Sequence, residues 1–306
     1  MHRPNRNGLN TRQIEVFKAV YECGSMTAAA TMLGVSQPAI TALVRQLEDR
    51  IGFALFDRSG RRLRPTVEGD LFYEDVDRAL TGIAMLAERA NDIRERRRGR
   101  LVIGAMPALS MGFVQSVIAE LTQGPDAISI ALMTRHSPML LSLVALNQLD
   151  VAMVAYLGPS PQVHVQSVHP IPLVCVLPPG HRLARQDRVQ IADLAGEDLI
   201  GLSSLDRLGP RVQELLASHH VAVRNPISTE LTMAACGFVL QGLGVALTDP
   251  FSAGLFGHAG VQIRPFDPQI MVEIAIVRSM DLKPGVDTLA AHFIAATERS
   301  LRAMQS

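Results

Sequence analysis

The stretch MTAAATMLGVSQPAITALVR, residues 26–45, has the pattern of a helix-turn-helix. Gly34 lies at the expected turn, where a positive φ costs glycine little. Ser36 can cap the second helix, and Pro38 lies in its first turn, where a missing N–H does no harm. The stretch therefore predicts two short helices that cross tightly, the second ending near Arg50. The residues expected in their shared core are Ala29, Ala30, Leu33, Val35, Ile40 and Leu43.

The second helix presents three polar side chains, Gln37, Thr41 and Arg45, at steps of four residues, so all three share one stripe. A helix fits the major groove of DNA, where Gln can pair with adenine and Arg with guanine. Carbon atoms of Thr or Pro can contact the methyl group of thymine. The pattern predicts a recognition helix for double-stranded DNA, and a helical hairpin with a solvated polar face is the alternative.

The flanking residues complete a predicted winged domain over residues 1–66. Apolar side chains at helical spacing predict a first helix over residues 11–22. Residues 53–66, FALFDRSGRRLRPT, predict a β-hairpin whose arginines can reach phosphates or a narrow minor groove, with a solvated basic loop as the alternative. The candidate DNA-binding residues are Thr27, Ser36, Gln37, Pro38, Thr41, Arg45, Arg58, Arg61 and Arg62.

A long helix is predicted over residues 67–94, within a linker segment of residues 67–99. A single exposed helix cannot bury a sustained apolar seam alone, so its expected partner is the same helix of a second copy. The resulting homodimer or homotetramer would match a two-fold-related DNA site; the alternative is that the seam packs on the chain's own body. The basic run RERRRGR, residues 94–100, is expected to end the helix at a hinge. The seam consists of Phe72, Val76, Ala79, Ile83, Leu86, Ala90 and Ile93.

The composition predicts a globular protein of two or three domains. The chain has 306 residues, of which 48% are apolar, enough for sizeable cores. Residues 1–65 contain ten basic and five acidic residues, so this end carries +5 and, at zero net charge, the remainder carries −5. Three distant cysteines, Cys23, Cys175 and Cys236, argue against a disulfide framework or a zinc site and for the cytoplasm. Buried thiols are expected, with a redox pair of Cys175 and Cys236 as the alternative. Neither a signal peptide nor a membrane span is expected.

Strands and helices alternate from residue 101 onward. Expected strands at 101–105, 128–134 and 151–156, with helices at 109–121 and 139–148 between them, form a βαβαβ order. That order predicts a parallel sheet with right-handed crossovers. The Gly-Pro-Ser-Pro cluster at 158–161 could begin a second lobe containing strands at 163–168 and 173–177, with a return near Arg264 and Pro265.

Several motifs of the first seventy residues occur in one order: LNTRQIEVF at 9–17, MTAAA at 26–30, VSQPAI at 35–40, Leu47-Glu48, LFDR at 55–58, Pro65-Thr66 and Gly69. In this collinear set the chain resembles the LysR-type transcriptional regulators. The resemblance implies that residues 100–306 form an effector-binding domain similar to periplasmic binding proteins. The expected fold class is α+β, a winged helix-turn-helix and linker helix followed by two α/β lobes. Lobe I would comprise residues 100–161 and 265–306, and lobe II residues 162–264.

Candidate effector contacts follow the strands of both lobes. In open α/β sheets, ligands bind beyond the carboxyl ends of strands, where helix N-termini offer free amides and partial positive charge. Hydroxyls, a guanidinium, an imidazole and one carboxylate would suit a small anionic or zwitterionic molecule, although the hydroxyls could be only helix caps. The candidates are Pro107, Ala108, Leu109, Ser110, Thr134, Arg135, His136, Ser137, Ser203, Ser204, Thr248 and Asp249.

Within the family, the sequence MPAL at 106–109 and the MTAAA helix start resemble the regulators of octopine and nopaline catabolism. This resemblance implies an opine or another amino-acid derivative as the effector. The expected partners are double-stranded promoter DNA, a small-molecule effector, further copies of the chain and RNA polymerase, with no membrane and no cofactor.

The sequence contains no recognisable catalytic site. It lacks a nucleophile elbow, a His-Glu-x-x-His motif, a P-loop and a paired Cys-x-x-Cys. Gly242-Leu243-Gly244 follows an expected helix and precedes a strand, which reverses the order of a dinucleotide fingerprint. His219 and His220 are adjacent and point in different directions, so they make a poor metal pair. No catalytic or metal-binding residue is predicted; the alternative is a ligand-binding or catalytic protein with a fused DNA-binding head, which would turn over its ligand.

Overall fold

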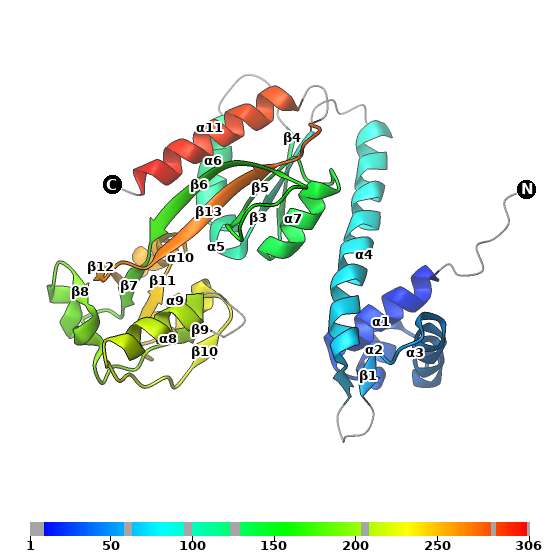
Figure 1. The fold of residues 1–306 in the computed structure, drawn as a ribbon, viewed down its shortest axis with the longest axis horizontal. Coiled ribbons are helices and arrows are strands. Elements are labelled where there is room, and N and C mark those ends of the chain that lie inside the picture. Colours follow the sequence, from blue (N-terminus) through cyan, green and yellow to red (C-terminus); the bar gives the residue numbers. More distant parts are fainter. Residues whose placement is uncertain are drawn as a thin grey trace, which may run out of the picture. The chain divides into compact units, whose positions relative to one another are not determined.

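The computed structural model describes residues 9–57, 63–94, 100–122, 129–202, 208–282 and 286–304. The chain divides into two compact units, Met1–Arg96 and Arg97–Ser306. Figure 1 shows that the described part of unit 1 is almost entirely helical, whereas the described part of unit 2 combines strands and helices. The division therefore separates a helical head from an α/β body.

Unit 1 is a winged helix-turn-helix followed by one long helix, which confirms the fold expected for this end of the chain. Gly34 ends α2 with a φ of 65°, so glycine occupies the turn as predicted. The wing strands pair antiparallel, with Phe56 opposite Pro65. The elements of unit 1 are α1 (Thr11–Cys23), α2 (Met26–Leu33), α3 (Gln37–Ile51), β1 (Phe56–Asp57), β2 (Arg64–Pro65) and α4 (Val67–Arg94).

The core of unit 1 lies where α1, α2 and α3 meet the start of α4. The ring of Phe17 lies 5.6 Å from that of Phe56 and 5.4 Å from that of Phe72, so one α1 side chain contacts both the wing and α4. Val35 was expected in this core but is 37% exposed. Its N–H donates to the carbonyl of Ala30 at 3.0 Å, which places it in the turn rather than between the helices. Buried residues of the helix-turn-helix include Ala29, Ala30, Ile40, Val44 and Leu47, with Leu33 and Leu43 partly buried beside them.

The apolar seam of α4 has two different environments. Val76 is buried in the core of unit 1, and Phe72 packs against that core. About two and three turns after Val76, Ile83 is 52% exposed and Leu86 is 64% exposed. The first part of the seam therefore packs on the chain's own head, whereas Ile83 and Leu86 further along are exposed.

None of the described helices is by itself both long and apolar enough to cross a membrane. The pair α2 and α3, bent by 109°, passes the same test of length and composition when taken together. Five apolar residues of this pair, Ala29, Ala30, Ile40, Val44 and Leu47, are buried in the core of unit 1.

Lobe I of unit 2 is a five-stranded sheet in the order β4-β3-β5-β13-β6. β3 pairs parallel with β4 and β5, as predicted, whereas β13 pairs antiparallel with β5 and β6. Helices cover both faces, because Ile103 lies in the core with α6 and α11 while a β-carbon on Gly104 would meet Leu140 of α7. The elements are β3 (Arg100–Ala105), α5 (Pro107–Ser110), α6 (Phe113–Leu121), β4 (Ser129–Thr134), α7 (Ser137–Ala145), β5 (Val151–Ala155), β6 (His164–Pro172), β13 (Met271–Arg278) and α11 (Asp287–Ala303).

Lobe II contains a four-stranded sheet in the order β11-β7-β12-β8 and a two-stranded sheet of β9 and β10. β7 pairs antiparallel with β11 and β12, and β12 pairs parallel with β8. The elements are β7 (Val174–Leu177), η1 (Arg182–Arg185), β8 (Val189–Gln190), η2 (Ile191–Leu194), β9 (Gly201–Leu202), α8 (Leu208–Ser218), β10 (Ser228–Thr229), α9 (Thr232–Leu240), β11 (Ala246–Thr248), α10 (Pro250–Gly257) and β12 (Gln262–Asp267).

Two sequence-based expectations about the lobes are wrong in detail. The strand expected at 163–168 in lobe II is β6, which pairs with β13 and belongs to lobe I. The chain therefore crosses between Pro172 and Val174 and returns between Asp267 and Met271, rather than at 161–162 and 264–265. A Gly-Pro cluster marks a turn, but it carries no information about which distant strand the next segment will pair with. The single helix expected at 109–121 is likewise divided into α5 and α6.

The two lobes touch through α10 of lobe II and the α5–α6 segment of lobe I. The rings of Phe113 and Phe251 lie 5.1 Å apart at an interplanar angle of 69°, and Phe251 is buried in the lobe I core. Gly112 has a φ of 79°, and a β-carbon there would press on the side chain of Leu255. The start of α10 is therefore part of the contact between the lobes.

Candidate DNA-binding and effector sites

Helix α3 separates a buried face from an exposed polar stripe. Ile40, Val44 and Leu47 are completely buried in the core of unit 1. On the other side, the Gln37 amide nitrogen donates to the Thr41 hydroxyl at 2.9 Å, and that hydroxyl donates to the Gln37 carbonyl at 3.1 Å. These two side chains therefore share one stripe, as their spacing predicted.

The other candidate DNA contacts of the helix-turn-helix are also accessible. Thr27 on α2 and Ser36, Pro38 and Arg45 at α3 are exposed. Ser36 occupies the N-cap position of α3 but makes no side-chain capping hydrogen bond, so its hydroxyl does not have the expected capping role. An N-cap serine without that bond leaves its hydroxyl available to another acceptor or donor.

The wing is anchored by a residue that sequence reasoning did not single out as functional. The Glu48 carboxylate of α3 accepts backbone N–H bonds from Leu55 at 2.8 Å and Phe56 at 3.3 Å. These two bonds join α3 directly to the start of β1. The sequence showed Glu48 as part of the Leu47-Glu48 motif. It did not show the partners of Glu48, which lie seven and eight residues further along the chain, beyond the end of α3. The candidate contacts Arg58, Arg61 and Arg62 lie outside the described residues.

The start of α4 is fastened to the same segment. The Thr66 hydroxyl donates to the Ala54 carbonyl at 2.7 Å and accepts from the Gly69 N–H at 2.9 Å. The Thr66 N–H also donates to the Leu55 carbonyl at 3.1 Å. The chain from α3 through β1 to the first turn of α4 is therefore one hydrogen-bonded assembly.

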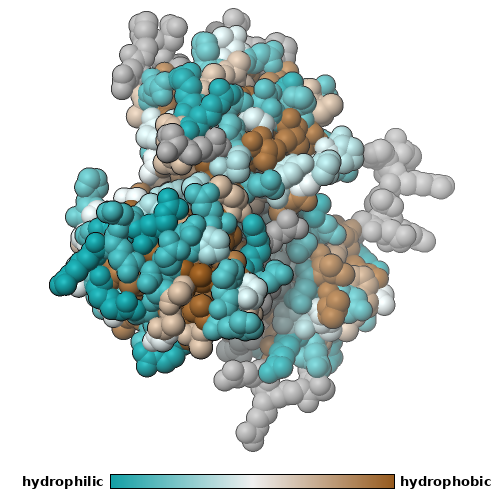
Figure 2. Space-filling model, turned by 60° about the vertical axis from the view of Figure 1, so that its left-hand side comes forward, coloured by the Kyte–Doolittle hydropathy of each residue, from teal (hydrophilic) through white to brown (hydrophobic). Residues whose placement is uncertain are grey.

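Exposed apolar side chains on α4 provide a candidate contact between copies. Ile83 and Leu86 are one turn apart, so they lie on neighbouring positions of one helix face. Val67 and Leu71, at the start of the helix, are exposed as well. Figure 2 shows that small, separate groups of hydrophobic residues (brown) also occur among hydrophilic residues (teal) on the face that it presents. What distinguishes the α4 residues is their recurrence along one helix.

In lobe I, the segments after β3 and β4 come together at one end of the sheet. We call residues 106–110 and 134–137 the lobe I edge. The Ser137 hydroxyl accepts from the Ala155 N–H at 2.9 Å and lies 3.9 Å from the Met106 sulfur. The candidate residues of these two segments are therefore neighbours, although they are about thirty positions apart in sequence.

The candidate residues of the lobe I edge differ in how much surface they offer to a ligand. Thr134, Arg135 and His136 are exposed, and the Arg135 guanidinium donates to the Thr134 carbonyl at 2.8 Å. Pro107 and Ala108 are partly exposed, whereas Leu109 and Ser110 are buried. The Ser110 hydroxyl donates to the Pro107 carbonyl at 3.0 Å. The accessible polar chemistry of this edge is thus centred on residues 134–136.

Thr248 and Asp249 are buried inside lobe II and bond within it. The Asp249 carboxylate accepts from the Ser252 N–H at 2.7 Å and caps α10, while the Thr248 hydroxyl donates to the Asp249 carbonyl at 3.2 Å. Burial raises the pKa of Asp249, an effect opposed by the hydrogen bond from the Ser252 amide. The sequence indicated a polar pair after a strand, but tertiary packing makes this pair a helix cap beside the lobe contact.

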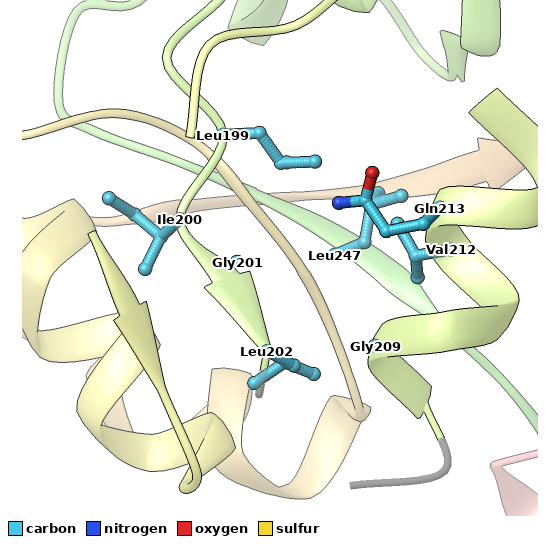
Figure 3. Close-up of a pocket in the computed structure, with 8 residues that line it drawn as sticks. All are labelled: Leu199, Ile200, Gly201, Leu202, Gly209, Val212, Gln213 and Leu247. Carbon is cyan, nitrogen blue, oxygen red and sulfur yellow. The ribbon is translucent and has the colours of Figure 1, made fainter. Parts of the chain in front are cut away.

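A small pocket in lobe II lies between β9 and α8 (Figure 3). Apolar side chains and two glycines line it, and Gln213 supplies the one polar side chain drawn there. The candidates Ser203 and Ser204 follow β9 directly but lie outside the described residues. Sequence reasoning did not identify this pocket, because its walls come from separate segments. The lining residues are Leu199, Ile200, Gly201, Leu202, Gly209, Val212, Gln213 and Leu247.

The cysteines and other possible metal ligands do not form a centre in the described ranges. No group of three His, Cys, Asp or Glu side chains there is arranged to hold a metal ion. Cys175 and Cys236 are buried free thiols, and desolvation raises the pKa of each to about 12. Both are therefore protonated and poorly nucleophilic at neutral pH.

Two family models match the chain. The model described as bacterial regulatory helix-turn-helix protein, lysR family, matches residues 11–70. The model described as LysR substrate binding domain matches residues 94–298. The matched ranges contain α3 and most of both lobes.

Several known regulators are similar to this chain over most of their length. Regulatory protein NocR of Agrobacterium fabrum is 35% identical over 296 residues, which cover 97% of this chain and 98% of NocR. The octopine catabolism/uptake operon regulatory protein OccR of Rhizobium meliloti is 33% identical over 288 residues, covering 93% and 95%. The transcriptional activator protein LysR of Escherichia coli is 30% identical over 273 residues, covering 89% and 88%.

Solved structures show the same fold at lower identity. The crystal structure of CbnR, a LysR family transcriptional regulator, matches with a TM-score of 0.62 at 19% identity, covering 96% of this chain and 99% of CbnR. Full-length CbnR complexed with its target DNA matches with a TM-score of 0.54 at 21% identity, covering 96% and 100%.

Proposed function

The chain belongs to the LysR family of DNA-binding transcriptional regulators, and we propose that it senses an opine or a related amino-acid-derived carboxylate. The octopine operon regulator OccR and the regulator NocR are similar to this chain over nearly their whole lengths. The observation that carries the ligand class is the exposed polar group Thr134, Arg135 and His136 on the lobe I edge. A guanidinium beside hydroxyl and imidazole groups suits a ligand carboxylate.

We infer that the α3 stripe reads DNA bases. Gln37 and Arg45 are the proposed base contacts, with Thr41 and Pro38 beside them for a thymine methyl. Thr27 and Ser36 would contact the phosphate backbone, together with the wing arginines Arg58, Arg61 and Arg62. This division assigns sequence preference to α3 and general affinity to the wing.

We further propose that two copies pair through the second half of α4. Ile83 and Leu86 are the supporting observation, because they are apolar, exposed and adjacent on one helix. Such pairing would present two heads to a two-fold-related promoter site, as a dimer or as half of a tetramer. We place this complex in the cytoplasm, with RNA polymerase as the partner that its DNA-bound form affects.

Ligand and DNA binding are coupled in this proposal. The effector must bind the two DNA-bound arrangements with unequal affinity, because a ligand with equal affinity for both shifts nothing. A sensor of this kind releases its ligand unchanged. Incubating the full chain with a candidate ligand should therefore leave the ligand's chemical form intact.

A thermal-shift screen of the full chain tests the effector class. The panel contains octopine, nopaline, arginine, lysine and simple carboxylates. A ligand present at about one hundred times its dissociation constant stabilises the folded chain by roughly 2.7 kcal/mol, which moves the melting temperature visibly. We expect an opine or amino acid to raise the melting temperature, and Arg135→Gln to weaken that rise while leaving the ligand-free melting temperature unchanged.

Two results would contradict the effector proposal. One is a panel in which no opine or amino acid stabilises a chain that still binds DNA. The other is an Arg135→Gln variant that binds the active ligand as tightly as the original chain. The matched control is Arg224→Gln, an exposed lobe II arginine that pairs with Asp198 at 3.0 Å, for which the ligand response should be unchanged.

A further inference from the structure

Two hydrogen bonds join helices α1 and α4, and each helix donates one of them to the other. The Tyr21 hydroxyl of α1 donates to the Asp70 carboxylate of α4 at 2.8 Å. In return, the Tyr73 hydroxyl of α4 donates to the Glu22 carboxylate of α1 at 2.9 Å. Each helix thus supplies one phenol and one carboxylate, so the pairs resist sliding of one helix along the other.

The two phenol rings and a lysine close the space between these pairs. The rings of Tyr21 and Tyr73 are stacked, with centroids 3.9 Å apart and an interplanar angle of 11°. The Lys18 ammonium pairs with Asp77 of α4, lies 3.4 Å from the Glu22 carboxylate, and is 5.8 Å from the centre of the Tyr73 ring. Stacked rings and a shared cation restrict rotation as well as sliding. We call these six residues the α1–α4 clamp: Lys18, Tyr21, Glu22, Asp70, Tyr73 and Asp77.

The hydroxyl groups of Tyr21 and Tyr73 stay protonated over the whole physiological pH range. Burial, together with the hydrogen bond to Asp70, raises the pKa of Tyr21 to about 12. Burial and the hydrogen bond to Glu22 also raise the pKa of Tyr73. Hydrogen bonds from neutral donors to carboxylates are stronger than those between two neutral groups.

The clamp acts on a helix whose beginning is already anchored to the recognition helix. Glu48 of α3 holds the start of β1, and Thr66 holds the first turn of α4 to the residues just before β1. The clamp adds attachments at Asp70, Tyr73 and Asp77, which span two further turns of α4. Together these bonds determine the direction in which α4 leaves the head.

We propose that the α1–α4 clamp sets the angle between the DNA-binding head and α4, and thereby determines which half-site spacing the dimer accepts. The inference rests on the dimer proposed above. Each added base pair moves a half-site by roughly 3.4 Å and rotates it by roughly 34° about the DNA axis. Two heads joined through their α4 helices can follow such a change only if the head tilts against α4, which the clamp opposes.

A spacing series measured with the full chain tests this proposal. The preferred operator is first selected from random DNA by the original chain, and its spacer is then lengthened and shortened by two base pairs. We expect the original chain to lose affinity by at least about tenfold on each altered spacer, or about 1.4 kcal/mol. Tyr21→Phe combined with Tyr73→Phe keeps both rings and removes both hydroxyl bonds. On the preferred spacer, the affinity of this variant should lie within about threefold of the original chain's. On each altered spacer, its loss of affinity should be only about threefold.

A second variant removes a different part of the clamp. Lys18→Met combined with Asp77→Asn deletes the cationic bridge while leaving both tyrosines in place, and it should reduce the spacing penalty in the same way. The matched control is Asp75→Asn, because Asp75 is 70% exposed and pairs with Arg78 of its own helix at 3.0 Å. The control should retain the full spacing penalty.

The outcomes separate failure of the clamp from failure of the proposed dimer. A dimeric original chain whose clamp variants keep the full spacing penalty overturns the clamp inference alone. Equal loss of the penalty in Asp75→Asn would also overturn it, since that change leaves the clamp intact. An original chain that is monomeric, or that selects a single half-site, overturns the dimer proposal and the clamp inference with it.

Discussion

The carbonyl oxygen of Leu55 lies where a β-carbon on Gly69 would have to be placed. The first turn of α4 can therefore approach the segment after α3 only because residue 69 has no side chain. The same carbonyl accepts the N–H of Thr66 at 3.1 Å, so it cannot move aside without losing that bond. The contact makes the start of α4 part of the head.

Replacing Gly69 by alanine should destabilise unit 1. The added methyl group meets backbone rather than a flexible side chain, and overpacking of this kind costs about 1–3 kcal/mol. Chemical unfolding of the full chain, followed by circular dichroism, would measure the loss. The control is Gly237→Ala in α9, where a β-carbon meets nothing within 4 Å. That change should be neutral or stabilising by roughly 0.5–1 kcal/mol, because alanine favours helices. Equal stability of the two variants would contradict the argument.

Removing the Arg45 side chain should change base preference more than overall affinity. Arg45→Ala or Gln37→Ala should reduce discrimination at one position of each half-site by about 1–3 kcal/mol, because a bidentate base contact is lost. Binding to a panel of single-base operator variants measures this. Arg224→Ala, which removes an exposed arginine of lobe II, serves as the charge-matched control. A base profile unaffected by Arg45→Ala would show that α3 does not read DNA as proposed.

A charge in the exposed part of the α4 seam should separate the copies. In the proposed dimer, Leu86→Glu loses the burial of one leucine per subunit, about 1.5–3 kcal/mol each, so the dissociation constant should rise at least about a hundredfold. Sedimentation over a range of protein concentrations measures this. Leu146→Glu introduces the same charge at a leucine of lobe I that is also exposed, and should leave the assembly intact. Dimers of unchanged strength in Leu86→Glu would exclude this face.

The buried carboxyl of Asp249 should make stability depend on pH. The pKa of Asp249 is raised in the folded chain. Its carboxyl group therefore contributes fully to the free energy of unfolding below its ordinary pKa of about 3.9, and this contribution is lost as the pH rises through the raised pKa. An asparagine at this position would be an equally good N-cap without a titrating group. We therefore expect Asp249→Asn to gain stability relative to the original chain between pH 4 and pH 7, as read from urea midpoints. Asp249→Ala should lose the cap, about 1 kcal/mol. Parallel pH profiles for the original chain and the Asp249→Asn variant would contradict the assignment.

The helix-turn-helix could be predicted from sequence because its signals are local. Gly34 at the turn, the four-residue spacing of Gln37 and Thr41, and the apolar positions of α3 all act within a few turns of chain, and the observed helices agree with them. Val35 was misplaced because its exposure depends on how the turn is closed. The Thr66 and Gly69 contacts with the segment after α3 were equally invisible, because their partners lie eleven to fourteen residues away.

The lobes show where local signals end. The Gly-Pro cluster at 158–161 indicated a break in the chain, yet β6 after it pairs with β13, a hundred residues further on. Thr248 and Asp249 had the right chemistry in the right kind of loop, but packing of α10 buried both and used the carboxylate as a cap. Residues 134–136 had similar chemistry and stayed exposed.

The sequence by itself determined the class of the head, the helical periodicity of α4 and the alternation of strands and helices in unit 2, because each depends on short-range spacing of apolar, polar and turn residues. Only the tertiary structure decided which strands share a sheet, which half of the α4 seam is already covered, and which polar side chains remain accessible. Those properties depend on contacts between residues distant in sequence, which no local pattern specifies.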